Sequence, residues 1–187
     1  MPFTKAIGYC PTQLISYATT ASFAVVQERL EEKIHKSESI STNVLAKIRQ
    51  AQTADEIVQS IQNVTQGDDF MYFTEYVHTM WIRTLTGNSR VPATVAYTFG
   101  NPLIARYIFQ EDITAATFIP LRLIIKEVNP PSAAGTDIPC AKTTISYHLP
   151  SSLIPETSNQ TLKDQLATLD AKVEKLVLDV IRETSNL

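Results

Sequence analysis

Residues 69–83 read DFMYFTEYVHTMWIR, the most aromatic stretch of the chain. Residues 70–77 alternate as a β-strand does, and both of the resulting faces are apolar or aromatic. A strand of this kind is expected in the centre of a sheet, covered on both sides. His78 falls at its end, and Trp81 and Leu85 continue at helical spacing. The stretch therefore predicts a strand that leads directly into a helix, with a histidine at the junction.

Four other segments combine β-prone residues with flanking turn residues. Strands are predicted at residues 13–19, 91–99, 117–128 and 143–148. Pro120, near the start of the third of these segments, indicates an edge strand or a bulge, because proline cannot donate a hydrogen bond to a sheet ladder.

Helical patterns fill much of the chain between these strands. Helices are predicted from Ser22 to about Lys36, at residues 43–50, after a capping box at residues 53–56, and from Pro102 onwards. Residues 37–42 are polar and interrupt the pattern. His35 lies off the apolar stripe of its helix and is expected to be solvated. Residues 38–66 are interpreted as a helical insertion in a single domain of residues 1–187, since a chain of this length makes one domain by default.

The C-terminal segment has the clearest periodicity. One apolar stripe is formed by Leu162, Leu166, Leu169, Val173, Leu176, Val177, Val180 and Ile181. This spacing predicts a long amphipathic helix. A helix facing the core of its own domain is favoured over a coiled coil, because the repeat is shorter than the three to four heptads that a coiled coil needs.

Composition excludes several functional classes. A net charge of −3 argues against nucleic-acid binding, which needs a surplus of basic residues. No apolar run approaches the length of a membrane span, and two cysteines beside prolines, Cys10 and Cys140, form no disulfide framework, so a cytoplasmic location is expected. Five glycines and three scattered histidines give no phosphate loop and no metal-ligand spacing. Neither a cofactor nor a metal is therefore predicted.

Three blocks of sequence resemble the "domain of unknown function 302" family. They are residues 73–78 (FTEYVH), residues 99–102 (FGNP), and residues 119–127 (IPLRLIIKE) followed by residues 145–147 (ISY). The resemblance covers about residues 14–37 and 69–181. It implies an α+β fold: a mostly antiparallel sheet with helices packed on one side and a long C-terminal amphipathic helix, often paired as a homodimer. Residues 38–66 and a loop at 129–140 are additions to the family pattern. With these additions, the chain resembles fungal members of the family.

The chain departs from the family pattern at three positions. Val77 and Phe118 stand where many members have acidic residues, and Thr144 stands where a tryptophan is common. If these positions surround one cavity, their apolar character favours an apolar ligand, since burying carboxylates is costly. The loss of an acidic residue at position 77 also removes a carboxylate that could orient His78 or raise its pKa.

The candidate site follows from these observations. His78 and Arg122 are candidate catalytic residues, and the candidate ligand-binding residues are Tyr72, Tyr76, Trp81, Tyr97 and Phe118. Strand alternation places Tyr72 and Tyr76 on one face and Glu75 on the other. Each of these residues also has a purely structural interpretation. The histidine could form hydrogen bonds with the backbone at the end of the strand, the aromatic residues could belong to the core, and the arginine could lie on the surface of an edge strand.

Two functions remain open. The first is cofactor-independent binding of a small hydrophobic organic molecule in an apolar, aromatic-lined pocket between sheet and helices, which could extend to isomerisation or cyclisation of that molecule. The alternative is a non-catalytic dimeric interaction or ligand-carrier module, in which the aromatic strand belongs to the core.

Overall fold

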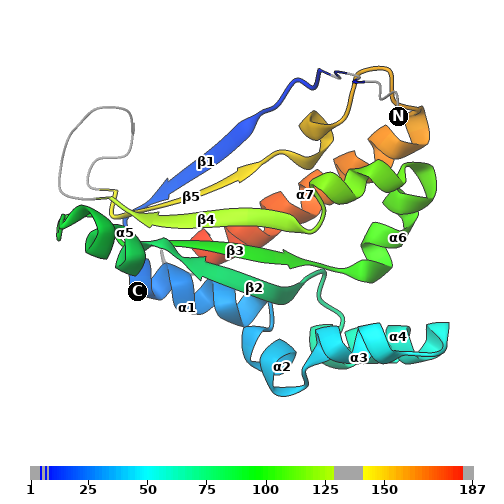
Figure 1. Ribbon diagram of the computed structural model, residues 1–187, viewed down its shortest axis with the longest axis horizontal. Helices are drawn as coiled ribbons and strands as arrows, with labels where there is room; N and C mark the ends of the chain where they lie inside the picture. The colour runs from blue at the N-terminus through cyan, green and yellow to red at the C-terminus, as the bar shows by residue number, and fades with distance from the viewer. Residues whose placement is uncertain (1–4, 6, 8, 129–140, 183–187) are drawn as a thin grey trace.

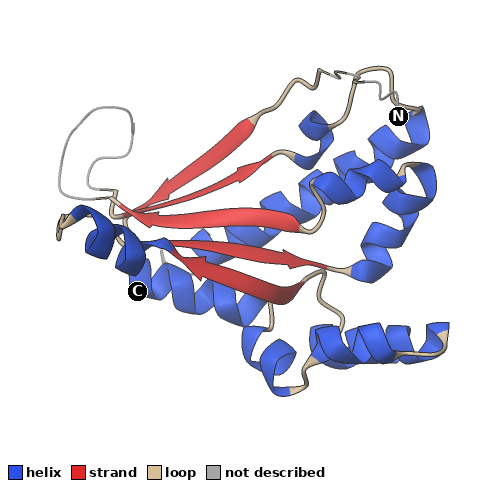
Figure 2. Cartoon of the chain, in the orientation of Figure 1, coloured by secondary structure: helices blue, strands red, loops and turns tan. Residues whose placement is uncertain are grey.

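The computed structural model describes residues 5, 7, 9–128 and 141–182. Within them, one antiparallel sheet has the strand order β1-β5-β4-β3-β2. The strands are β1 (Leu14–Thr19), β2 (Met71–Val77), β3 (Thr94–Gly100), β4 (Leu121–Glu127) and β5 (Thr143–His148). Strands β2 to β5 follow one another in space as in sequence, and β1 adds to the free side of β5 (Figures 1 and 2). The predicted loop at 129–140 lies outside the described residues.

Helices connect and cover the strands. The α-helices are α1 (Phe23–Lys33), α2 (Lys36–Ser41), α3 (Val44–Gln50), α4 (Ala54–Thr65), α5 (His78–Thr86), α6 (Pro102–Glu111) and α7 (Gln160–Arg182). Two short 3-10 helices are η1 (Ile113–Thr117) and η2 (Pro150–Leu153). Figure 1 shows α1 and α7 behind the sheet, on one of its faces. The predicted α+β architecture is thus confirmed.

The main core lies between this helical layer and the sheet. Along β4, Leu121, Leu123 and Ile125 are buried against the helices, whereas Arg122 and Lys126 are exposed on the other face. The predicted stripe of α7 faces this core, with Leu162 to Val180 buried in the same cluster as the inner side chains of the sheet. The C-terminal helix is therefore a core helix of its own chain, as the short repeat predicted.

Polar side chains cap two helices at the starting positions that the sequence predicted. Thr53 Oγ1 accepts a hydrogen bond from the Glu56 amide at 3.2 Å at the start of α4. Asn101 Oδ1 accepts from the Leu103 amide at 2.9 Å at the start of α6, directly before Pro102. These contacts satisfy backbone donors that a helix leaves free at its N-terminus.

A second apolar cluster lies at the β2 side of the sheet. Val44, Ile61 and Val64 of α3 and α4 pack against Met71 of β2, and Phe73 adds to them. This cluster explains why both faces of β2 are apolar, although β2 is an edge strand rather than the predicted central one. Helices of the segment 38–66 pack against β2. Its side chains are therefore apolar because helices cover them, and not because a further strand lies beside β2.

Three further boundaries differ from prediction. Residues 37–42, expected to be irregular, contain most of α2, and α1 ends at Lys33 because His35 adopts a left-handed conformation with φ of 51°. Asn43 has φ of 50° and ends α2 in the same way. Pro120 lies before β4, which is the central strand of the sheet, so proline marks neither an edge nor a bulge there.

None of the helices that the structure describes has the length and apolar character needed to cross a membrane.

Candidate functional site

A bulge in β2 decides which side chains share a face. The register with β3 slips between Tyr72 and Thr74, so that Tyr72 lies opposite Phe99 and Glu75 lies opposite Tyr97. Phe99 and Tyr97 face the main core. Tyr72 and Glu75 therefore point to the helical side together, contrary to the alternation predicted from the sequence, because a bulge inserts one residue into the strand.

Beyond the bulge, four predicted residues gather on the open face of the sheet; we call them the open-face cluster. The Tyr76 and His78 rings are stacked, with centroids 6.5 Å apart and an interplanar angle of 21°. The Trp81 ring meets His78 edge to face at 5.8 Å. The Arg122 guanidinium carbon lies 5.7 Å from the centroid of the Tyr76 ring. Three elements, β2, α5 and β4, thus bring these side chains into one row.

The position of this cluster is held by the contacts of α5. Thr79 Oγ1 accepts a hydrogen bond from the Thr94 amide at 2.7 Å. Arg83 donates to the Val91 carbonyl oxygen from Nη2 at 2.6 Å and from Nε at 3.0 Å. These bonds connect α5 to the first residue of β3 and to the segment that precedes it. His78, the first residue of α5, is therefore placed by a fixed helix and not by a free loop.

The rings of the cluster remain accessible. Tyr76 is 49% exposed and Trp81 is 51% exposed. Among the described residues, His78 has ring contacts but no hydrogen bond to either ring nitrogen. Arg122 is exposed, as in the alternative that placed it on the protein surface, but its strand is the central one of the sheet and not an edge strand. Both imidazole nitrogens and the guanidinium are thus free to contact a bound molecule.

The other predicted ligand-binding residues lie elsewhere. Tyr97 is fully buried on the helical side of β3. Tyr72 is half-buried on that same side, and Phe118, at the end of η1, packs against the main core. The seven predicted site residues therefore do not surround one pocket, because the bulge and the two faces of the sheet separate them.

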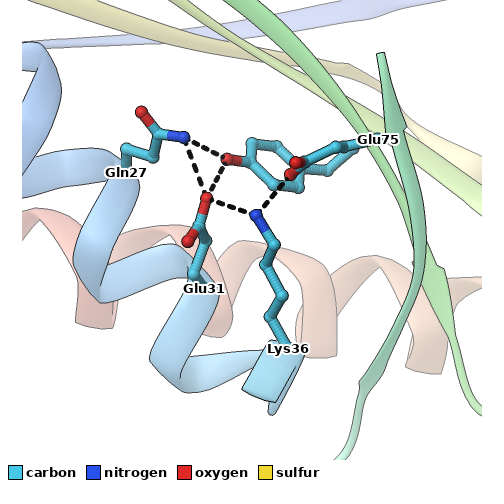
Figure 3. A network of polar contacts seen from close by, with 5 residues as sticks. Gln27, Glu31, Lys36 and Glu75 are labelled. Atoms are coloured by element: carbon cyan, nitrogen blue, oxygen red, sulfur yellow. Dashed lines mark hydrogen bonds and ion pairs between the residues drawn. The ribbon is translucent and has the colours of Figure 1, made fainter. Parts of the chain in front are cut away.

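Figure 3 shows a polar network that sequence analysis missed. Glu31 Oε1 accepts from the Tyr97 hydroxyl at 2.6 Å, from Gln27 Nε2 at 2.9 Å and from Lys36 Nζ at 3.0 Å. Lys36 Nζ also donates to Glu75 Oε2 at 2.7 Å. The spacing of Gln27 and Glu31 is a helical signal. Nothing in the local sequence indicates the contacts of Lys36 and Tyr97, which cross from one element to another.

Charge and burial define the state of this network. Burial works to raise the pKa of Glu31, but hydrogen bonds from Tyr97, Lys36 and Gln27 outweigh it and hold that pKa below its ordinary value. Burial, and then the neighbouring Glu31, raise the pKa of Tyr97 far above its ordinary value. Burial works to lower the pKa of Lys36, but Glu75 and Glu31 raise it. At neutral pH the network therefore holds one cation between two carboxylates, with a neutral tyrosine beneath them.

A polar cleft of about 610 Å³ adjoins the network. Glu31 and Lys36 line it, together with residues of α2 and with Asp68. His35 lies in its wall with its side chain 14% exposed, and His35 Nε2 is 2.9 Å from Asp68 Oδ2. The prediction that His35 is solvated is wrong, because its side chain is largely buried and contacts Asp68 in the turn between α4 and β2.

Little space is left between the sheet and the helices. The apolar cavity bordered by Phe70, Ile104, Ile108 and Leu169 measures about 10 Å³, room for one water molecule. Val77, Phe118 and Thr144 do not line this cavity or the cleft. Val77 lies opposite Val95 on the core side of the sheet, whereas Thr144 lies opposite the exposed Lys126, so these two departures from the family pattern are on different faces.

The described residues include no group of three or more histidine, cysteine or acidic side chains placed to bind a metal ion. Cys10 is exposed as a free thiol, and Cys140 lies outside the described residues.

Comparison with known proteins identifies the family. The family model described as "Domain of unknown function DUF302" matches residues 46–180. The chain belongs to the DUF302 family. A crystal structure of an uncharacterized conserved DUF302 protein from Bacillus stearothermophilus is similar, with a TM-score of 0.58 and 15% sequence identity over 90% of this chain and 97% of that chain. At this identity the likeness to a second DUF302 protein establishes the fold alone. No curated protein sequence matches the chain.

Proposed function

We propose that the open-face cluster binds a small, flat, hydrophobic organic molecule that carries a carbonyl or carboxylate group, without a cofactor. One observation supports this most strongly. Tyr76 and Trp81, each about half exposed, flank His78 on a face of the sheet that also presents Arg122. Large aromatic side chains gathered on a surface mark binding sites more often than scattered ones do.

The chemistry of each side chain suits such a ligand. Tyr76 and Trp81 offer ring faces and edges for stacking. Arg122 can donate two parallel hydrogen bonds to a carboxylate, a geometry that lysine lacks. His78 can accept or donate a proton at either ring nitrogen. The neutral part of the ligand would thus rest on the rings, while its oxygen atoms meet the guanidinium.

The proposal includes catalysis: the cluster would isomerise or cyclise its ligand in the cytoplasm. His78 would exchange a proton with the bound molecule, and Arg122 would stabilise negative charge that develops on its oxygen. Holding a flexible substrate in a folded shape would contribute by fixing the reacting atoms near one another.

Trp81 provides the test, since it is the only tryptophan of the chain and a member of the cluster. The protein is titrated with 2-naphthoate and with the neutral 2-naphthylmethanol while tryptophan emission is recorded. We expect saturable quenching by both, with the carboxylate tighter. Arg122→Met should weaken the carboxylate about tenfold and leave the alcohol unchanged.

Lys126→Met is the matched control, because Lys126 is an exposed cation on the same face of the same strand. An equal loss in both variants, or quenching that never saturates, would refute a specific site at Arg122. Native mass spectrometry of protein purified gently from its own host then seeks a natural ligand. If a molecule is released on denaturation, its turnover by wild type and by His78→Ala tests catalysis.

The second candidate is an interaction module in which α5 contacts a second copy of the chain. On α5, Met80 and Leu85 are 69% and 77% exposed, and Trp81 of the same helix is 51% exposed, so this helix presents large apolar side chains to solvent. If this function holds, the protein forms a homodimer that Met80→Lys and Leu85→Lys dissociate. Sedimentation velocity over a range of concentrations measures this. If the protein is a monomer at all concentrations and binds the ligand saturably, the interaction module is excluded and ligand binding is supported.

A further inference from the structure

The strand β1 forms a free edge of the sheet. It pairs with β5 on one side, and no described residue pairs with its other side. Figure 1 shows β1 along the outer side of the sheet, at the end opposite to β2. An edge strand leaves a row of backbone N–H and C=O groups without partners in the sheet, and such a row can pair with a further strand. The functions proposed above assign no role to this edge.

Hydrogen bonds at the two ends of β1 show which of its backbone groups point outward. The Gln13 carbonyl oxygen accepts from the Leu149 amide at 2.9 Å, and the Thr19 carbonyl oxygen accepts from the Lys142 amide at 2.8 Å. Both carbonyl groups therefore point toward the β5 side. Because the direction of these groups alternates along a strand, the odd-numbered residues between them point the same way. The groups that face the free side are the N–H and C=O groups of Leu14, Ser16 and Ala18.

The edge at β2 is protected, whereas the edge at β1 is not. At β2 the strand is bulged after Tyr72, helices of the segment 38–66 pack against it, and the Tyr72 amide donates to the Ile34 carbonyl oxygen at 2.7 Å. Proteins commonly protect edge strands with bulges, charged residues or proline. The sequence of β1, LISYAT, has no charged residue and no proline, and its pairing with β5 is regular from Leu14 to Thr19. A partner strand can therefore reach β1.

We propose that β1 pairs with β1 of a second copy of the chain, antiparallel about a two-fold axis at Ser16, so that the two sheets join edge to edge. Ser16 then lies opposite Ser16 of the second copy, and Leu14 of each copy lies opposite Ala18 of the other. This is the register in which all three outward-facing residues are paired. Each pair exchanges two backbone hydrogen bonds, which gives about six in total.

The side chains suit this register on both faces of the sheet. Ile15 and Tyr17 lie on the helical side, partly buried against the main core. In the dimer, Ile15 of each copy lies opposite Tyr17 of the other, and cross-strand pairs of an aromatic and a β-branched residue stabilise antiparallel sheets. On the open face, Leu14 is 62% exposed and gains an apolar neighbour in Ala18.

A second copy fits this edge better than an unrelated strand, because the two-fold axis repeats every favourable pair and β1 brings no like charges together. A single pair of strands makes a small interface, so we expect a weak dimer whose population rises with protein concentration.

The test is sedimentation velocity over a range of concentrations, on wild type and on Ser16→Lys. Ser16 is exposed, so that the fold should tolerate lysine there, which thermal unfolding verifies. In the dimer, however, two lysines would lie opposite each other at the axis. We expect wild type to dimerise and Ser16→Lys to dimerise at least about tenfold more weakly. Ser37→Lys is the matched control, since it adds the same charge at an exposed serine of α2, and it should dimerise as wild type does.

Charge complementation then locates the axis. Ser16→Glu alone should also be monomeric, but an equal mixture of Ser16→Glu and Ser16→Lys should form heterodimers, because opposite charges meet at the axis. Native mass spectrometry distinguishes the heterodimer from both homodimers by mass.

Three results would overturn the inference. The first is a wild type that stays monomeric at all concentrations, as it would if the edge accepted only strands of other proteins. The second is a mixture of folded Ser16 variants that forms no heterodimer. The third is a dimer that Met80→Lys dissociates and Ser16→Lys does not, which would place the contact at α5. Ligand binding at the open-face cluster is measured separately, by Trp81 emission.

Discussion

Lys36 and Glu75 form an ion pair, with Nζ 2.7 Å from Oε2, across 39 positions of sequence. The bulge after Tyr72 makes this contact available, because without it the alternation of β2 would place Glu75 on the other face. The same ammonium group reaches Glu31 at 3.0 Å. The extra residue in β2 thus allows an ion pair that connects α2 to the sheet.

Replacing this lysine should destabilise the protein. In Lys36→Met, Glu31 and Glu75, which are 25% and 24% exposed, lose their shared cation. We expect the free energy of unfolding to fall by about 2 kcal/mol, between the values for exposed and for buried ion pairs. Urea denaturation measures it. Lys47→Met, at an exposed position of α3, should change stability by less than about 0.5 kcal/mol, and an equal loss in both would rule out the network as the cause.

The network should also make stability depend on acid. The pKa of Glu31 is lower in the folded protein than its ordinary value of 4.5, mainly because hydrogen bonds from Tyr97 and Lys36 outweigh burial. A lowered pKa stabilises the fold above pH 4.5, and this contribution is lost as pH falls through the folded-state pKa. Glu31→Gln should be less stable at pH 7 and lose less stability between pH 5 and pH 3 than wild type, in thermal unfolding.

Glu28→Gln is the control for that measurement, since Glu28 is exposed on the same helix. Its pH profile should follow wild type. If Glu31→Gln shows the same acid sensitivity as wild type, other carboxylates govern the low-pH behaviour.

Asp170 in α7 should have the opposite pH dependence. Burial raises its pKa above the ordinary value of 3.8, although a hydrogen bond from Ser151 lowers it in part. A raised carboxyl pKa favours the fold at low pH, and this advantage disappears as pH rises through the folded-state pKa. Asp170→Asn can still accept from the Ser151 amide and should raise Tm at pH 7 by about 2 °C.

The gain in Tm for Asp170→Asn should shrink at pH 3, where the aspartate is largely protonated. Differential scanning calorimetry at both pH values shows whether it does. A lower Tm at pH 7 would mean that the Ser151 contact requires the charge.

Two glycines should tolerate alanine very differently. Gly67 follows α4 with φ of 100°, so that Gly67→Ala is strained although the space around it is open. We expect a cost of about 1 kcal/mol or more. At Gly100 an added Cβ would lie 3.4 Å from Phe73, an ordinary contact, and Gly100→Ala should cost less than about 0.5 kcal/mol. Equal costs in chemical denaturation would contradict this account.

Much of the secondary structure was predictable because its causes are local. The stripe of α7 and the caps at Thr53 and Asn101 depend on residues within one or two turns of each other. The open-face cluster was predictable in part for the same reason. Tyr76, His78 and Trp81 are neighbours in sequence, at a junction of strand and helix that the spacing identified.

The sequence by itself thus determined all five strands and most of the helices, though not α2, because hydrogen-bonding caps and hydrophobic periodicity act over a few residues. Only the tertiary structure decided that β2 is an edge strand, that Glu75 faces Lys36 and that His35 contacts Asp68. Each of these depends on packing between residues far apart in the chain. A shift of one residue in a strand reverses the face of every side chain after it, and local sequence does not show that shift.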